Sequence, residues 1–136
     1  MKRYNIIYLL DATGGQVLMC RRRKEPYKGL LNLVGGKIKP GEDHPAAAYR
    51  ELFEETGIAE QDVTLAHIMD FTYYNPDCLL EAYAGQLRSD IPVQGDENDL
   101  LWVSVEENFF DASKFAGDGN IGHIQIIEQY RRDAGA

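Results

Sequence analysis

The sequence predicts a single α/β domain, residues 1–136, in which a mixed β-sheet lies between helices. Segments with the composition of strands lie on both sides of an early helix, and a second amphipathic helix ends the chain. Apolar runs such as 6–10 (IIYLL) fit strands that are covered on both faces. A chain of 136 residues is long enough to bury a stable core as one domain.

The predicted strands are runs of β-branched, aromatic and aliphatic residues that end at turn residues. The first two, 3–10 and 16–22, flank an Asp-Ala-Thr-Gly-Gly turn, so we expect them to form a hairpin. The other strands are expected at 31–34, 63–74, 78–87 and 100–105.

The early helix has clear boundaries in the sequence. Asp43 is a suitable N-cap, and Pro45 falls in the first turn, where its missing N–H does no harm. Gly57 fits a left-handed C-terminal cap, so the helix is expected to end at about Thr56. Two further helices are predicted at 105–115 and 120–132.

Composition and charge exclude several classes of protein. The net charge of −8 argues against general nucleic-acid binding, which needs a basic surface. The apolar run at 6–10 is too short to cross a membrane, and the residues around it lack the features of a signal peptide. Cys20 and Cys78 have no metal-like spacing, so we expect reduced thiols in a cytoplasmic protein.

The early helix concentrates carboxylates near one end. Glu51, Glu54 and Glu55 stand at positions i, i+3 and i+4, which share one helical face. Oxygen ligands in this number suit Mg²⁺ or Mn²⁺ and suit zinc poorly. For these three residues taken alone, a solvent-exposed acidic face is the alternative explanation.

Residues beside the carboxylates also suit a metal or phosphate site. Arg50 precedes Glu54 by four residues and can hold a carboxylate through a two-pronged hydrogen bond. Gly35 and Gly36 let the backbone approach a metal or a phosphate closely, because no side chain intervenes. Lys37 follows at once, in a position to neutralise a phosphate oxygen.

The spacing of these residues matches a known signature. After Gly36, five residues lead to Glu42, seven more lead to 50–52 (REL), and one further residue leads to 54–58 (EETGI). This is the pattern G-x5-E-x7-R-E-U-x-E-E-x-G-U, where U is an aliphatic residue, and every position matches. The sequence therefore resembles the Nudix hydrolases.

The resemblance implies a Nudix-type α/β/α sandwich with a mixed sheet between helices. It also implies hydrolysis of a nucleoside diphosphate linked to another group, with Mg²⁺ or Mn²⁺ as cofactor. The positions that the resemblance assigns to metal binding are the carbonyl of Gly36 and the side chains of Glu51, Glu54 and Glu55. The same resemblance gives Glu42 and Arg50 the role of orienting these carboxylates.

The attacking water needs a general base. Glu51 is one candidate. The other is Glu97, because several Nudix enzymes bring a Glu from a later loop to the metal site; Asp96 and Glu81 are fallback candidates.

Residues outside the signature select the substrate. The segment 31–38 (LNLVGGKI) resembles the same stretch in MutT-type 8-oxo-dGTP diphosphatases, although Leu31 and Leu33 replace the aromatic residues often found there. The likeness implies that Asn32 and Leu33 contact the base. It also implies further substrate contacts, from Arg22, Phe115, Asp118 and Asn120. Asn120 as a helix N-cap, and Asn32 as a partner of nearby backbone, are the structural alternatives.

We therefore expect a pyrophosphatase that acts on a small-molecule nucleotide, as a monomer or a homodimer. The leading prediction is a MutT-like enzyme that converts a purine (d)NTP, 8-oxo-dGTP among them, into the monophosphate and pyrophosphate. The alternative substrates are dinucleoside polyphosphates, nucleotide sugars and ADP-ribose. A hypothesis of another class is a non-catalytic, nucleotide-sensing Nudix-like domain, which the complete set of carboxylates disfavours.

Overall fold

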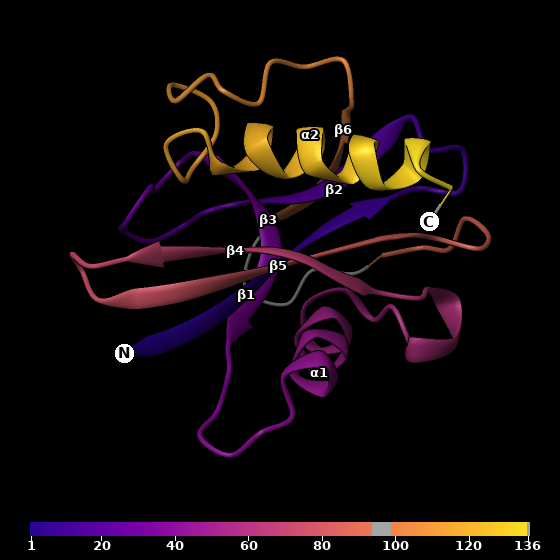
Figure 1. Ribbon diagram of the computed structural model, residues 1–136. Helices are drawn as coiled ribbons and strands as arrows, with labels where there is room; N and C mark the ends of the chain where they lie inside the picture. Colours follow the sequence, from indigo (N-terminus) through magenta and orange to yellow (C-terminus); the bar gives the residue numbers. More distant parts are fainter. Residues whose placement is uncertain (94–98, 136) are drawn as a thin grey trace.

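A computed structural model describes residues 1–93 and 99–135 of the chain. They form a six-stranded mixed sheet with a helix on each face (Figure 1). The strands are β1 (Lys2–Leu10), β2 (Gln16–Arg21), β3 (Leu31–Lys37), β4 (Ala66–Tyr73), β5 (Cys78–Gln86) and β6 (Asp99–Ser104). The helices are α1 (His44–Thr56), the short 3-10 helix η1 (Glu60–Asp62) and α2 (Asn120–Asp133). The predicted α/β/α sandwich is confirmed.

The sheet has the order β4-β5-β1-β3-β2-β6. β1 and β5 run parallel, and the other neighbouring strands are antiparallel. β1 and β2 pair only beside their turn, at Leu10 and Val17, because β3 lies between them farther along. The predicted hairpin is therefore limited to its turn. β3 also runs farther than expected, through Gly35 and Gly36 to Lys37.

Alternation along β1 divides the core into two layers. Ile6, Tyr8 and Leu10 belong to the layer that contains Ile121 and Ile124 of α2. The intervening Ile7 and Leu9 belong to the layer that contains Ala48 and Leu52 of α1. The sheet thus separates the two helices, and each helix has its own apolar contact surface.

The predicted ends of α1 are confirmed. The Asp43 side chain accepts a hydrogen bond from the Ala46 N–H at 3.0 Å, and Pro45 lies in the first turn. Gly57 has a φ of 79°, and its N–H donates to the Phe53 carbonyl. The two caps fix the ends of α1, so that Glu51, Glu54 and Glu55 lie in its C-terminal half.

The helix predicted at 105–115 is wrong, because this segment is a series of turns. Asn108 Oδ1 accepts the Phe110 N–H, and Asp111 Oδ1 accepts both the N–H and the hydroxyl of Ser113. Such side chains offer the backbone local partners that compete with helical hydrogen bonds. Phe109 and Phe115 are nevertheless buried, and they pack edge to face.

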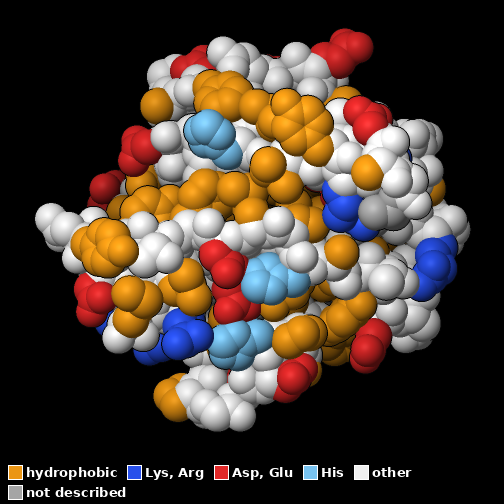
Figure 2. All heavy atoms as spheres, in the orientation of Figure 1, with side chains coloured by type: hydrophobic (Ala, Val, Ile, Leu, Met, Phe, Trp, Pro, Cys, Tyr) orange, Lys and Arg blue, Asp and Glu red, His pale blue; other side chains and the backbone are white. Residues whose placement is uncertain are grey.

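The surface differs between the two layers. In Figure 2, a band of apolar side chains lies beneath α2, and acidic, basic and histidine side chains lie together on the part of this face nearer to α1 as well as around its rim. Both cysteines are free, with Cys20 buried and Cys78 half-buried. No helix among the described residues has the length and apolar character needed to cross a membrane.

Candidate active site

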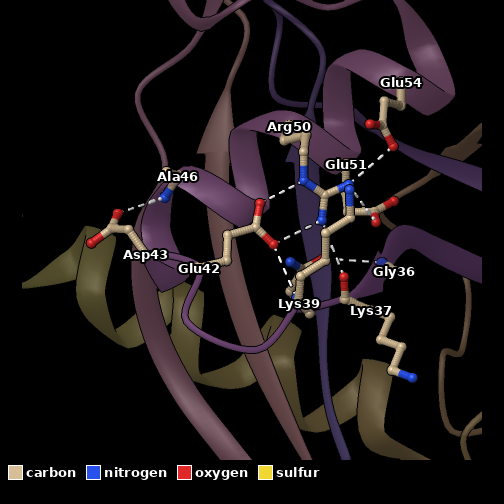
Figure 3. A network of polar contacts seen from close by, with 10 residues as sticks. Gly36, Lys37, Lys39, Glu42, Asp43, Ala46, Arg50, Glu51 and Glu54 are labelled. Atoms are coloured by element: carbon tan, nitrogen blue, oxygen red, sulfur yellow. Dashed lines mark hydrogen bonds and ion pairs between the residues drawn. The ribbon is translucent and has the colours of Figure 1, made fainter.

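Arg50 is the centre of a polar network on α1 (Figure 3). Its Nε and one terminal nitrogen donate to the two carboxylate oxygens of Glu42, at 2.6 and 3.0 Å. Its other terminal nitrogen donates to Glu51 at 3.0 Å and to Glu54 at 3.1 Å. A further bond, of 3.1 Å, reaches the Lys37 carbonyl. One guanidinium therefore fixes three carboxylates and the end of β3.

Glu42 holds the loop before α1 in place. Its carboxylate accepts the Lys39 N–H at 3.0 Å in addition to the two bonds from Arg50. These hydrogen bonds lower the pKa of Glu42 to about 2, with Arg50 as the main cause. Glu42 therefore stays ionised well below neutral pH and remains a charged partner of Arg50.

Glu51 lies directly over Gly36. A Cβ added to Gly36 would stand only 2.3 Å from Oε2 of Glu51 and 2.4 Å from its carboxyl carbon. Burial raises the pKa of Glu51, and the bonds from Arg50 oppose this shift. Glycine at 36 is therefore required to admit this carboxylate, and the carboxylate is held in a partly desolvated position.

The other two carboxylates of the cluster occupy different surroundings. Glu54 is exposed and contacts Arg50, whereas Glu55 accepts the Gly35 N–H at 3.1 Å. Within the described part of the chain, no three His, Cys, Asp or Glu side chains stand close enough to hold a metal ion. The convergence predicted from the helical spacing is thus incomplete, because Arg50 lies between Glu51 and Glu54 and Glu55 turns toward β3.

The donor set nevertheless fits a hard divalent cation. It consists of carboxylates beside a strand backbone that lacks side chains at Gly35 and Gly36, and it has more negative charge than Arg50 neutralises. Oxygen donors of this kind suit Mg²⁺ and Mn²⁺. Glu51, Glu54 and Glu55 all belong to α1, at helical positions that share one face.

Asn5, which the sequence did not predict as a site residue, lies beside Gly36. Asn5 is 1% exposed, and its Oδ1 accepts the Gly36 N–H at 3.0 Å. An asparagine inside an apolar strand is a signal in itself, because a buried amide needs partners. Its partner is 31 residues away, so the sequence alone does not identify it.

Glu81 lies beside Asn5 on the other flank, and it is 3% exposed. One of its oxygens is 2.6 Å from Nδ1 of His44, and the other accepts the Tyr83 hydroxyl at 2.9 Å. Glu81 is therefore a buried, paired carboxylate on β5. Glu97 and Asp96, the other candidates for an additional acidic residue, lie outside the described residues.

Of the predicted substrate residues, Arg22, Asn32 and Lys37 lie near β3. The Nε of Arg22 donates to the Pro26 carbonyl at 2.7 Å. Asn32 is half-buried and pairs with Cys20 on β2, and its Oδ1 accepts the Leu33 N–H. Lys37 has an exposed side chain at the end of β3.

The other predicted substrate residues belong to the α2 side. Leu33 and Phe115 are each 2% exposed and pack in the α2 layer of the core. Asp118 accepts the Tyr27 hydroxyl at 3.1 Å. Asn120 is the first residue of α2 and is 7% exposed; among the described residues its Oδ1 has no partner. The alternative role of Asn120 as N-cap is not realised, because Gly119 holds that position.

The model of the NUDIX domain family matches residues 1–128 of this chain. The fold and the Gly36–Glu51 arrangement agree with that match. The chain belongs to the Nudix hydrolase family.

Two curated relatives carry different names. An ADP-ribose pyrophosphatase of Methanocaldococcus jannaschii is 30% identical over 120 residues, which cover 86% of this chain and 66% of that protein. A protein of Mycobacterium tuberculosis named "Putative 8-oxo-dGTP diphosphatase 2" is 34% identical over 96 residues, covering 69% of this chain and 68% of the relative.

Solved structures share the fold at low sequence identity. An Ap4A hydrolase of C. elegans, solved as a binary complex, has a TM-score of 0.77 at 19% identity and covers 98% of this chain and 99% of its own. A bifunctional NMN adenylyltransferase/ADP ribose pyrophosphatase of Francisella tularensis, complexed with AMP and a Mn ion, has a TM-score of 0.72 at 20% identity. That match covers 97% of this chain and 41% of the Francisella protein, so this chain spans less than half of it.

Proposed function

We propose that this chain is a Mg²⁺- or Mn²⁺-dependent nucleotide pyrophosphatase that hydrolyses a purine (d)NTP, 8-oxo-dGTP among them, to the monophosphate and pyrophosphate. The observation that carries the proposal is the Glu51 carboxylate seated over Gly36, with Arg50 fixing Glu51, Glu54 and Glu42 around it. The Mn ion in the Francisella structure supports the choice of cofactor.

In the proposed reaction, Gly36, Glu51, Glu54 and Glu55 would hold the metal. The bound cation would polarise the phosphate oxygens and acidify the attacking water. Arg50 orients the carboxylates through its fork of hydrogen bonds, and Lys37 offers a positive charge at the end of β3. Glu51 is a candidate base, since burial raises its pKa and so strengthens it as a proton acceptor. Glu97 stays the second candidate.

The purine part of the proposal rests on hydrogen-bonding side chains at two places. Asn32 lies on β3, four residues before Gly36, and Asp118 and Asn120 lie at the start of α2. Asp118 and the Oδ1 of Asn120 are both acceptors, which suits the two adjacent donors on the edge of a guanine-type base. The mycobacterial relative's name supports the same substrate class.

ADP-ribose is the second candidate substrate. The relative named as an ADP-ribose pyrophosphatase matches 86% of this chain at 30% identity, a longer match than that of the mycobacterial protein.

A substrate panel with product identification tests the proposal. Purified protein with Mg²⁺ or Mn²⁺ is incubated with dGTP, 8-oxo-dGTP, dATP, ADP-ribose and Ap4A, and products are separated by ion-exchange chromatography. The proposal expects the highest kcat/KM for a guanine-type triphosphate, with pyrophosphate as product. A preference for ADP-ribose, giving AMP and ribose 5-phosphate, would select the second candidate.

The variant Glu54→Gln tests whether Glu54 is a metal ligand. Glu54 is exposed and contacts only Arg50 among the ion pairs of the described residues, so the variant is expected to fold normally. Turnover should fall by at least about a hundredfold, because a metal ligand is lost. Activity equal to that of the wild type would contradict the assignment of Glu54.

A further inference from the structure

Asn5 touches both glycines that border the carboxylate cluster. Its Oδ1 accepts the Gly36 N–H at 3.0 Å, and its backbone carbonyl would stand 2.1 Å from a Cβ added to Gly35. Among the described residues, no other side chain accepts a hydrogen bond from the Gly36 N–H. The Gly35–Gly36 segment of β3 is therefore in direct contact with Asn5, which belongs to the neighbouring strand β1.

The Asn5 amide also has an unused donor. Among the described residues, its Nδ2 has no hydrogen-bond partner, although the residue is 1% exposed. A buried amide donor without a partner costs about 1–3 kcal/mol. An apolar residue of similar size would avoid this cost, so packing alone does not account for an asparagine here.

Asn5 lies between two carboxylates. On β3, Gly36 is its pairing neighbour, and Glu51 lies over Gly36. On β5, its neighbour is Glu81, whose two oxygens are engaged by His44 and by the Tyr83 hydroxyl. The Glu81 carboxylate is thus engaged by partners other than Asn5, while Gly36 leaves space for Glu51 on the other side.

We propose that Asn5 is a positioning residue of the active site, which holds the Gly36 peptide for metal binding through Oδ1 and keeps a donor, Nδ2, at the base of the carboxylate cluster. The inference rests on the proposed metal-dependent function. Residues that orient metal ligands commonly change metal affinity or activity by 10- to 100-fold when they are replaced.

Two variants separate positioning from packing. Asn5→Leu keeps a similar volume but removes the acceptor for the Gly36 N–H. Asn5→Asp keeps that acceptor, replaces the Nδ2 donor with a second oxygen and adds a negative charge. Glu128→Gln is the control, because Glu128 is equally buried but belongs to α2, on the opposite face of the sheet.

Mn²⁺ affinity is measured without nucleotide, from the loss of the free-ion EPR signal, alongside thermal unfolding. We expect Asn5→Leu to raise the Mn²⁺ dissociation constant by roughly 10- to 100-fold. Asn5→Asp should recover most of the affinity, and Glu128→Gln should bind as the wild type does. Wild-type affinity in Asn5→Leu, or equal weakening in all three variants, would overturn the proposal.

A measurement on the unmodified protein covers the case in which Asn5→Leu does not fold. In ¹H–¹⁵N spectra, saturating Mg²⁺ should shift the Gly36 amide and the Asn5 side-chain NH₂ signals, and leave the Glu128 amide in place. No shift at Asn5 under saturating Mg²⁺ would overturn the inference. Because these readouts need no substrate, a wild type that binds Mn²⁺ but hydrolyses no nucleotide would refute the proposed function and leave the role of Asn5 standing.

Discussion

The two helices each carry an arginine that grips a carboxylate with two nitrogens, but the surroundings of the two pairs differ. On α2, Arg131 donates to both oxygens of Glu128, at 2.6 and 2.9 Å. On α1, Arg50 makes the same two-pronged contact with Glu42 and also binds Glu51 and Glu54. The α2 pair matches one cation with one anion, whereas the α1 network has one cation for three anions.

This difference separates a structural ion pair from a site that has capacity for a cation. On α2, the charge of Arg131 pairs with the buried Glu128 carboxylate, and the pair leaves no excess negative charge. Surplus carboxylates on the α1 side are stabilised when a further cation joins them. The comparison predicts that substitutions in the α1 network reduce catalysis, whereas equivalent substitutions in the α2 pair affect stability alone.

The largest expected difference is between Glu51→Gln and Glu128→Gln. Loss of the Glu51 ligand should lower kcat/KM by roughly three orders of magnitude, since metal stabilisation supplies several kcal/mol. Burial raises the pKa of Glu51, so its ionised form is disfavoured in the folded protein. The neutral glutamine should therefore leave the free energy of unfolding equal or slightly higher. Enzyme assays and urea denaturation measure both effects.

For the control on α2, we expect a loss of stability without a loss of catalytic activity. Glu128→Gln weakens a buried pair, so it should lower the unfolding free energy by about 1–3 kcal/mol and leave kcat/KM within twofold. If both variants lost activity in proportion to lost stability, the distinction between the two networks would fail.

Arginine-to-lysine substitutions compare the two networks directly. Lysine keeps the charge but not the planar fork, so both Arg50→Lys and Arg131→Lys should cost about 1–3 kcal/mol in unfolding free energy. Only Arg50→Lys should reduce turnover, by roughly 10- to 100-fold, because it releases Glu51 and Glu54 together. Steady-state kinetics on both variants, at a temperature where each is folded, decides the matter. Equal turnover in the two would place Arg50 outside the catalytic site.

Helix α1 and its acidic end were predictable from local features of the sequence. The caps Asp43 and Gly57, and the spacing of the glutamates, are encoded within one short segment, so the helix and its acidic end could be read from the sequence. The turns at 105–115 were misread because helix-compatible residues there are outweighed by the side-chain bonds of Asn108 and Asp111.

Contacts between distant segments were not predictable in the same way. Asn5 meets Gly36 only because β1 pairs with β3, and Glu81 meets His44 only because β5 lies beneath the start of α1. Each residue looks like an isolated polar side chain until the strand order is known. The position of Arg50 between Glu51 and Glu54 also follows from the geometry of side chains, which the helical spacing does not specify.

The two adjacent glycines of β3 sharpen the comparison within the active site. An alanine at 36 would meet only the end of the flexible Glu51 side chain, whereas an alanine at 35 would meet the Asn5 backbone, and Gly35 has a φ of 154°. Gly36→Ala should therefore reduce turnover about tenfold by displacing Glu51, and change the unfolding free energy by less than about 1 kcal/mol. Gly35→Ala should cost about 3 kcal/mol or more in stability.

Thermal denaturation and kinetics on both alanine variants test this division. A stable Gly35→Ala would show that the close approach of Asn5 to β3 is dispensable. Unchanged turnover in Gly36→Ala would show that Glu51 functions equally well away from the Gly36 backbone.

The smallest expected effect concerns the ends of the two helices. α1 begins with the Asp43 side chain bonded to the Ala46 N–H, whereas α2 begins at Gly119 with no side-chain cap. Asp43→Ala should lower the unfolding free energy by about 1 kcal/mol, and Asp43→Asn, an equally good N-cap, should restore it. Because the cap lies at the opposite end of α1 from Glu54 and Glu55, turnover of the folded variant should stay within twofold. A larger loss of turnover in Asp43→Ala, restored by Asp43→Asn, would show that the start of α1 also sets the positions of its carboxylates.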